Sequence, residues 1–498
     1  YNTQLNGQPG ETNVNNTGRN WAYSKTNFEA SPLNRVNEAY APGASWVGSE
    51  NATVAADRHS VKMKYWINTA DDAVRIWNVN DVANSFGTYS TTAIYAAGEL
   101  YKNVTEDEHG RQVIEFKDKE GKVILKKVQL TAAIEITGAG SGHSGWICTY
   151  YIYDDLNNLR AVIQPEGVKL LDGANWANCN PINTSVYTQL LPEQTFRYEY
   201  DHRNRMIMKK VPGAGEVYMV YDARDRLVMT QDANMRNANK WMVTKYDVLN
   251  RPVETGLLVS STNFLSHRNA AATSTDYPSI TSGYEQLTYT AYDSYSTLPA
   301  VSLSATYLTT WNSNFTATNN DVYPYPQMPT QSTAVKGMVT WTKVKVLNSS
   351  SDFIYTVMIY DDKGRVIQTQ TKSDVTGGVD VATTQYSWAG QPLVIVQKQE
   401  VTGTNAQTHT LVTKMEYDEL GRVKEVKKKI NADAEKSITR NEYDKLGQLK
   451  NKKLANYYNG NTLETLNYDY NIRGWMLGIN RSYLQQDNST KFAFELAY

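Results

Sequence analysis

Residues 140–145 read GSGHSG, which matches the glycine-rich pattern G-x-G-x-x-G of dinucleotide-binding turns. In such a site a helix begins at the last glycine, so that its amide dipoles face the pyrophosphate. The residues that follow, Trp146–Tyr153, are aromatic and β-branched, which is typical of a strand. We therefore expect a loop at this position and no bound cofactor.

Three residues have side chains that bind soft metals, namely His143, Cys148 and Cys179. No C-x-x-C or H-x-x-x-H spacing joins them, and three scattered ligands fall short of a closed zinc site. The aspartates at 154–155 and 361–362 lack the D-x-D-x-D-G pattern of a calcium loop. None of the six histidines stands in a G-x-S-x-G or H-E-x-x-H motif. The sequence therefore predicts no catalytic or metal site, and it leaves open whether the two cysteines pair.

Aromatic rings are a further source of chemistry, because they can stack on sugars. The best positions for a carbohydrate platform are Trp311, Trp341 and the tyrosine-rich stretch 277–325. Most of the 35 tyrosines must nevertheless line strands, since tyrosine suits a half-buried pleated surface.

Charge and hydropathy argue against two classes of partner. The formal net charge of −1 gives no field that would attract nucleic acid. Lysines are dense at 414–453, but acidic residues alternate with them, which fits amphipathic strands with a solvated face. No run approaches the roughly 20 apolar residues that span a bilayer. We expect no nucleic-acid partner and no membrane-spanning segment.

A heptapeptide repeat forms the elements that position these side chains. Its clearest copies are YDDKGRV at 360–366 and YDELGRV at 417–423. Close relatives begin at Tyr153, Tyr200, Tyr221, Tyr246 and Tyr443, and degenerate copies begin at Glu106, Lys117 and Tyr386.

The aspartate of each copy predicts a type I turn, because its carboxylate can accept the amide hydrogen two residues on. These aspartates include Asp154, Asp201, Asp222, Asp247, Asp361, Asp418 and Asp444. The residue three positions later must adopt positive φ, as in a hairpin closed by a G1 bulge. Only Gly, Asn and Asp, which tolerate that conformation, fill this position. They are Gly110, Gly121, Asn157, Asn204, Asp225, Asn250, Gly364, Gly390, Gly421 and Gly447.

Arginine follows the positive-φ residue in six copies. Its stem can cover a neighbouring tyrosine ring while its guanidinium pairs with carboxylates. The alternative is a solvated charge that keeps sheet edges from pairing outward. The arginines are Arg111, Arg205, Arg226, Arg251, Arg365 and Arg422.

The spacing of the repeats predicts the architecture. The step from Asp201 to Asp222 is 21 residues and the step from Ser387 to Asp418 is 31, which suits two strands and two connections. A single hairpin cannot bury its apolar face, so neighbours must stack. We expect an all-β fold of hairpins stacked into a continuous spiralling sheet. Short helices on loops are expected at Thr92–Leu100, Gly167–Trp176 and Ser185–Leu191.

Repeat density divides the chain into five stretches. Residues 1–60 are an extended lead-in, 61–137 hold the first strands and degenerate repeats, and 146–259 carry regular repeats. Residues 260–335 are a Ser/Thr/Asn/Tyr-rich excursion in which Tyr292-Asp293 is a partial match, and regular repeats fill 336–498. Both ends look cut, so we interpret the chain as an internal piece of a longer protein.

These repeats and their connecting phrases resemble the Rhs/YD-repeat family, which includes teneurins and the shell components of insecticidal Tc toxins. The likeness covers about residues 100–498 and looks closest to the large secreted Rhs proteins of Bacteroidetes. The residues that carry it are Phe28–Val36, Asp107–Lys126, Tyr198–Gln231, Lys336–Leu347 and Tyr468–Asn480.

The resemblance implies a sheet ribbon that closes into a hollow cocoon around a polypeptide cargo, in many members a C-terminal toxin. It also implies a secreted or cell-surface bacterial protein that uses a secretion apparatus such as type IX. The family's core domain with its aspartyl self-cleavage site has no counterpart in these residues, so no catalytic residue carries over. We expect a shell wall and no enzyme. The alternative is a cell-surface adhesin that binds surface glycans through residues 260–335.

Overall fold

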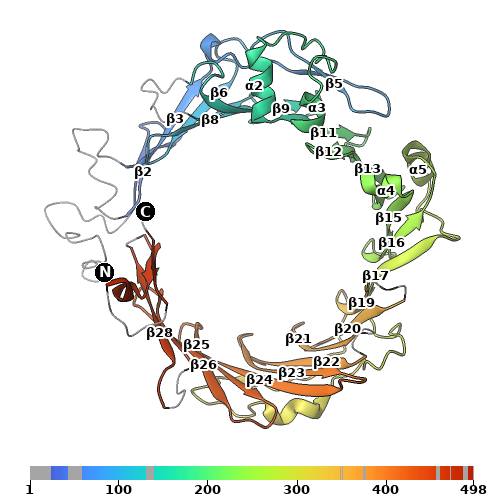
Figure 1. Cartoon of the computed structure of the whole chain (residues 1–498), viewed down its shortest axis with the longest axis vertical. Coiled ribbons are helices and arrows are strands. Elements are labelled where there is room, and N and C mark those ends of the chain that lie inside the picture. Colours follow the sequence, from blue (N-terminus) through green and yellow to red (C-terminus); the bar gives the residue numbers. More distant parts are fainter. Residues whose placement is uncertain are drawn as a thin grey trace. The chain divides into compact units, whose positions relative to one another are not determined.

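The structure is a computed structural model, and its fold is nearly all β (Figure 1). Twenty-eight of the described strands are hydrogen-bonded into one antiparallel sheet, and β4 (Asn78–Asn80) with β5 (Thr88–Ser90) forms a separate hairpin. The predicted all-β fold of stacked hairpins is therefore confirmed. The structure describes residues 24–42, 59–130, 140–347, 349, 351–373, 377–455, 460–471, 473–485 and 492–496.

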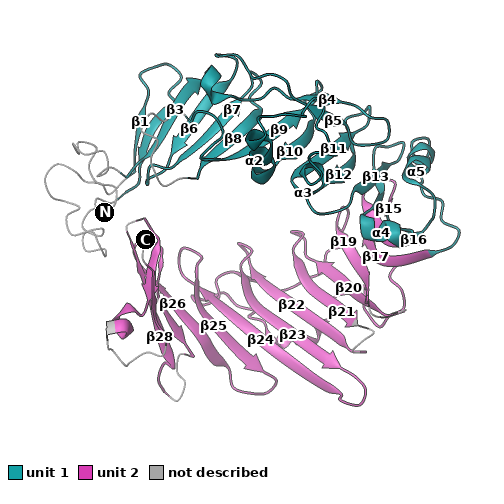
Figure 2. Ribbon diagram, turned by 45° about the horizontal axis from the view of Figure 1, so that its top comes forward, with its two compact units in different colours: residues 1–243, 258–283 teal, residues 244–257, 284–498 magenta. Residues whose placement is uncertain are grey.

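The chain divides into two compact units, residues 1–243 with 258–283 and residues 244–257 with 284–498 (Figure 2). In the first unit each strand pairs antiparallel with the next along the sheet. The order is β1 (Lys25–Phe28), β2 (Val36–Tyr40), β3 (Val61–Ile67), β6 (Tyr101–Glu106), β7 (Gln112–Lys117), β8 (Val123–Gln129), β9 (Trp146–Tyr153), β10 (Leu159–Ile163), β11 (Thr195–Tyr200), β12 (Met206–Lys210), β13 (Val217–Tyr221), β14 (Leu227–Gln231) and β15 (Lys240–Tyr246).

Two segments cover one face of this first sheet. Residues 68–100 carry η2 (Ala70–Asp72), β4 and β5, and residues 164–194 carry α2 (Pro165–Gly173) and α3 (Leu190–Glu193). Strand residues alternate between the two faces, and the inward ones join these segments in one core. That core includes Tyr89, Leu171 and Leu190 from the covering segments and Phe116, Tyr150 and Ile152 from the strands.

The second unit continues the same pattern of antiparallel pairing. After β16 (Pro252–Val259), the ladder runs from β17 to β30 through every strand except β18 (Pro326–Gln327), which pairs with β22. Its strands are β17 (Tyr284–Tyr292), β19 (Val339–Lys345), β20 (Phe353–Tyr360), β21 (Val366–Ser373), β22 (Val379–Ser387), β23 (Pro392–Val401), β24 (Gln407–Tyr417), β25 (Val423–Ile430), β26 (Lys436–Tyr443), β27 (Leu449–Leu454), β28 (Glu464–Tyr470), β29 (Met476–Ile479) and β30 (Phe494–Glu495).

The repeat hairpins carry one extra residue on the returning strand. Tyr221 pairs with Leu227 and Val220 pairs with Met229, so Val228 has no partner opposite it. Such a bulge turns two consecutive side chains to the same face, and Val228 and Met229 are both buried. The register shifts in the same way beside Tyr153, Tyr200, Tyr292, Tyr360, Tyr386, Tyr417, Tyr443 and Tyr470.

The expected excursion at 260–335 consists of two insertions. The first carries α5 (Phe264–Ala271) between β16 and β17. The second, residues 293–338, replaces the short turn of a repeat hairpin, because Tyr292 pairs with Val339 across its base. This second insertion carries η3 (Thr309–Asn314) and β18, and it packs on the sheet of its own unit instead of forming free loops.

The three expected helices have different outcomes. Gly167–Trp176 corresponds to α2, which begins at Pro165 because proline suits the first position of a helix. Ser185–Leu191 contains only the start of α3. The helix expected at Thr92–Leu100 is wrong, because Asn68 holds this stretch in an irregular turn. The side-chain amide nitrogen of Asn68 donates to the Ala96 carbonyl at 2.8 Å, and Asn68 Oδ1 accepts from the Leu100 backbone amide at 2.7 Å.

Candidate functional site

The turn of each repeat is held by its aspartate. Asp418 Oδ1 accepts hydrogen bonds from the amides of Leu420 at 3.0 Å and Arg422 at 2.8 Å. Gly421, the third residue after Asp418, has a φ of 79°. The same two hydrogen bonds, from the backbone amides two and four residues on, are accepted by Asp154, Asp201, Asp222, Asp247, Asp361 and Asp444. Positive φ also occurs at Gly110, Gly121, Asn157, Asn204, Asp225, Asn250, Gly364, Gly390 and Gly447.

The repeat arginine binds the aspartate of its own turn. Arg205, Arg226, Arg251, Arg365 and Arg422 each donate from Nε to the second carboxylate oxygen at 2.7–2.8 Å. Burial raises the pKa of Asp418, but hydrogen bonds from the amide and the guanidinium of Arg422 outweigh burial and lower it. The carboxylate is therefore charged and occupied by its own turn.

The same arginine also covers the tyrosine that opens the next repeat. The distance from the guanidinium carbon to the ring centroid is 4.2–4.8 Å in four repeats, a cation–π geometry. In these four repeats the contact favours the first interpretation of the repeat arginine, because a solvated edge charge would not cover a ring. The pairs are Arg205 with Tyr221, Arg251 with Tyr292, Arg365 with Tyr386, and Arg422 with Tyr443.

The covered tyrosine hydroxyl completes what we call the tyrosine–arginine contact. It donates to the carbonyl of the first residue of the preceding repeat's returning strand, as Tyr443 does to Val423 at 2.9 Å. Six tyrosines, the four covered ones among them, make this bond at 2.6–3.2 Å, and the acceptors are backbone carbonyls of methionine, proline and valine residues. They are Tyr221, Tyr292, Tyr360, Tyr386, Tyr417 and Tyr443.

Tyr292-Asp293, a partial match by sequence, makes the tyrosine contacts of a repeat, but its aspartate binds residues distant in sequence. Arg251 covers the Tyr292 ring, and its Nη1 donates to Asp293 Oδ1 at 3.1 Å. The Gly337 amide donates to the same carboxylate oxygen at 2.6 Å. These hydrogen bonds, that of Arg251 first, lower the pKa of Asp293 to about 2. Its turn is closed by residues more than forty positions away, so the heptapeptide pattern alone does not reveal it.

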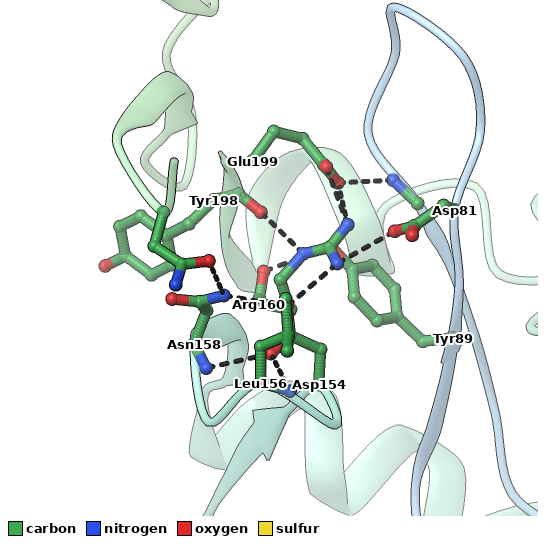
Figure 3. A network of polar contacts seen from close by, with 10 residues as sticks. Asp81, Tyr89, Asp154, Leu156, Asn158, Arg160, Tyr198 and Glu199 are labelled. Carbon is green, nitrogen blue, oxygen red and sulfur yellow. Dashed lines mark hydrogen bonds and ion pairs between the residues drawn. The ribbon is translucent and has the colours of Figure 1, made fainter. Parts of the chain in front are cut away.

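Arg160 lies at the bulge position of its repeat, and its guanidinium meets Asp81, Asp154 and Glu199 (Figure 3). Its side chain is only 5% exposed, and its Nη2 donates to both oxygens of Glu199 at 2.6–2.7 Å. Its Nη1 pairs with Asp81 at 2.8 Å and with Asp154 at 3.2 Å. Burial lowers the pKa of the guanidinium, but the bonds to Glu199 and Asp81 outweigh burial and raise it.

This network ties the β4–β5 hairpin to the sheet. The Gly87 amide donates to Glu199 Oε1 at 2.6 Å, and the Tyr89 hydroxyl donates to the Arg160 carbonyl at 3.1 Å. These partners are not evident from the sequence, because Glu199 and Arg160 are 39 residues apart and no local pattern links them.

Three buried glutamines hold the insertion at 293–338 to the sheet of the second unit. Gln385 accepts from the Thr316 amide at 3.0 Å and donates to the Thr316 carbonyl at 2.7 Å, as a strand neighbour would. Gln368 makes the same pair of bonds with Leu308, and Gln370 binds Ser304 and Thr306. All three side chains are at most 1% exposed.

The glycine-rich loop at 140–145 is a loop, as expected, and β9 follows it. The Gly142 amide donates to the Asp71 carbonyl at 2.8 Å. The Gly140 and Gly142 carbonyls accept hydrogen bonds from the buried Lys127 ammonium at 2.9 and 2.5 Å. The loop therefore contributes acceptors that compensate a buried cation.

The residues considered as metal ligands lie in the core. His143 Nε2 is 2.8 Å from the Tyr150 hydroxyl, and its Nδ1 is 3.3 Å from Asp172 Oδ1. Burial lowers the pKa of His143 to about 3, which keeps the imidazole neutral. Cys148 and Cys179 are both buried and free, and burial raises the pKa of Cys148 to about 11. Within the described ranges, no three His, Cys, Asp or Glu side chains gather as metal ligands.

The two tryptophans considered for a sugar platform pack on the sheet. Trp341 is 5% exposed, and Trp311 packs against the cluster formed by Phe315 and Leu393. Trp341 is therefore buried and Trp311 half-buried, whereas Tyr325 in the tyrosine-rich stretch is 68% exposed, so a sugar platform stays a prediction. Among the described helices, none is long and apolar enough to cross a membrane.

Comparison with known proteins gives one partial family match and distant structural neighbours. A family model described as a domain of unknown function, DUF6443, matches residues 1–60, of which only 24–42 and 59–60 are described. No curated protein matches the sequence. The Tc holotoxin pore of Photorhabdus luminescens is similar over 92% of this chain and 19% of that chain, at 11% identity and a TM-score of 0.36.

A crystal structure of TcdB2-TccC3 without its hypervariable C-terminal region is similar over 91% of this chain and 21% of that chain. The identity is 13% and the TM-score is 0.32. This chain therefore spans about a fifth of the length of the structures it matches.

Proposed function

We propose that this chain is a stretch of wall in a YD-repeat container that encloses or carries a polypeptide cargo. The observation that supports the proposal is the tyrosine–arginine contact. At four places it joins one hairpin to the next through the same bonds, and a contact that repeats can extend a sheet for as long as the repeat continues. Long antiparallel ladders also leave few unpaired backbone groups, which a container wall requires.

The finer part of the proposal rests on the resemblance of the repeats to Rhs proteins. The cargo would be a toxin at the C-terminus of the same polypeptide, in a secreted polymorphic toxin of Bacteroidetes. Export would use a bacterial secretion apparatus, type IX being the route we propose, and the mature protein would be secreted or held at the cell surface.

We also propose that the wall acts sterically and carries out no reaction. The repeat carboxylates are occupied by their own turns, as at Asp418. His143 is buried between Tyr150 and Asp172. A wall of this kind would keep its cargo from solvent and from targets until release.

Electron microscopy of the intact protein tests the container directly, and we expect a hollow shell with additional density inside. Limited proteolysis of the same sample should leave the cargo uncut until the wall is denatured. A solid or extended particle, or a cargo that is cut as fast as the free polypeptide, would refute the proposal.

A further inference from the structure

Four neighbouring repeats of the second unit expose a large apolar side chain at or beside the turn. Trp388 is 68% exposed, Leu420 78%, Leu446 39% and Trp475 44%. We call these four residues the apolar turn row. Turn positions favour Gly, Asn, Asp and Ser, so exposed Trp and Leu here need an explanation. At the other end of these hairpins the connections 402–406 and 431–435 read TGTNA and NADAE, and the exposed apolar residues there include Leu347 and Ile430.

Successive turns of the row lie side by side. The Gln391 side-chain amide donates to the Gly421 carbonyl of the next turn at 3.3 Å. On the other side, the Lys363 ammonium donates to the Trp388 carbonyl at 3.4 Å. Each hairpin adds two strands, so neighbouring turns are about 10 Å apart. The row is therefore a line of separate apolar side chains and not a continuous patch.

Basic side chains accompany the apolar ones. The Lys363 ammonium is 5.1 Å from the Trp388 ring centroid, and the Arg473 guanidinium carbon is 5.0 Å from that of Trp475. Lys445 is exposed directly before Leu446. The exposed acids of these turns are Asp362 and Glu419, whereas the turn aspartates are engaged by their own amides.

We propose that the apolar turn row is a membrane-contact surface, which inserts its four side chains into the interfacial layer of a phospholipid bilayer. Tryptophan prefers that layer, and Lys or Arg beside it can meet lipid phosphates. Fluid lipid closes around single side chains that stand about 10 Å apart, whereas a protein partner needs about 800 Å² of continuous surface on each side. The proposed contact with the bilayer is peripheral, and it does not depend on any cargo.

Vesicle sedimentation of the whole chain tests this proposal. The probes are vesicles of phosphatidylcholine with phosphatidylglycerol and vesicles of phosphatidylcholine alone. The test variant carries Trp388→Ser, Leu420→Ser, Leu446→Ser and Trp475→Ser. The matched control carries Leu347→Ser and Ile430→Ser, which are exposed apolar residues of the same unit, 81% and 51%, outside the row.

We expect the unmodified chain to sediment with the mixed vesicles and the test variant to lose at least about tenfold in partition coefficient. The control should bind as the unmodified chain does. Brominated lipids should quench tryptophan fluorescence in the unmodified chain and in the control, and quench less in the test variant. Circular dichroism melts of all three proteins establish that each is folded.

Three results would overturn the proposal. The first is an unmodified chain that binds neither vesicle, and the second is a folded test variant that binds as tightly as the control. The third is a test variant that converts a dimer into a monomer in analytical ultracentrifugation without changing vesicle binding. That last result would assign the row to a contact between copies of the chain.

Discussion

The guanidinium carbon of Arg422 lies 4.2 Å from the ring centroid of Tyr443, although the two residues belong to successive repeats. Arg422 at the same time donates to Asp418 in its own turn, and Tyr443 donates to the Val423 carbonyl beside Arg422. One side chain therefore stabilises a turn and fixes the position of the next hairpin. This is how a local motif of seven residues specifies a long sheet.

The coupling between these two side chains is measurable in a double-mutant cycle. We expect Arg422→Met and Tyr443→Leu to be non-additive by about 0.5–1 kcal/mol in urea unfolding, because either change removes the same cation–π contact. Combining Arg422→Met with Tyr289→Leu on β17 is the control and should be additive. Additivity in both cycles would show that the contact contributes no stability.

The positive φ of Gly421 predicts a specific cost of substitution. Gly421→Val should lower the free energy of unfolding by about 1 kcal/mol or more, because a β-branched residue resists that conformation. Gly421→Asn is the matched control, since asparagine occupies the same position in the turns at 157, 204 and 250. We expect the free energy of unfolding to fall clearly less in the asparagine variant than in the valine variant. Equal free energies of unfolding for the valine variant and the unmodified chain would argue against a strained turn.

Gln385 has a role that substitution can isolate. Gln385→Leu leaves both backbone groups of Thr316 without their partner in a buried site, so we expect a loss of about 1–3 kcal/mol. The insertion at 293–338 should then become more sensitive to limited proteolysis. Gln397→Leu, on the exposed part of β23, should change stability by less than about 0.5 kcal/mol. Unchanged proteolysis of the insertion in Gln385→Leu would contradict this role.

The buried pair of Arg160 and Glu199 predicts a rescue. Either Arg160→Leu or Glu199→Leu leaves one buried charge without its principal partner, which should cost about 3–5 kcal/mol in denaturant unfolding. The double variant removes both charges at once, so it should be markedly more stable than either single variant. A double variant as unstable as the sum of the two would show that the two charges act independently.

The buried, neutral His143 predicts a pH dependence. Its pKa is lowered to about 3 by burial, whereas a histidine in the unfolded chain titrates near about 6.5. The unfolded state then binds more protons below about pH 6.5, so the free energy of unfolding should fall from that pH toward about pH 3. His143→Gln should reduce this slope without abolishing it, because burial also lowers the pKa of His267. An identical slope in the variant would refute the assignment.

The turns were predictable because their determinants are local. An aspartate that accepts two nearby amides and a residue three positions later that tolerates positive φ are both visible in seven letters. The all-β fold followed from the spacing of these turns, since hairpins of that length must stack to bury their apolar face. The sequence of the turn also predicts the bulge. The bulge places two consecutive residues such as Val228 and Met229 in the core, and only the structure shows this.

The contacts that join distant segments were not predictable in this way. Arg160 and Glu199 find each other only because β10 and β11 pair across an insertion of about thirty residues. Gln368, Gln370 and Gln385 look like ordinary strand residues until the insertion at 293–338 packs against them. Asp293 finds its hydrogen-bond partners, Arg251 and the Gly337 amide, only when segments far along the chain come together.

The sequence by itself determined the unit of this protein, a hairpin with a fixed turn, because each turn is stabilised within a few residues of chain. Only the tertiary structure decided which faces are covered, where charges are buried, and which side chains remain exposed at the turns. Those outcomes depend on the packing of segments far apart in sequence. Contacts between such segments stabilise the fold only after the chain has folded back and brought the segments together. A local pattern therefore specified the strands of this sheet, and long-range packing specified its surfaces.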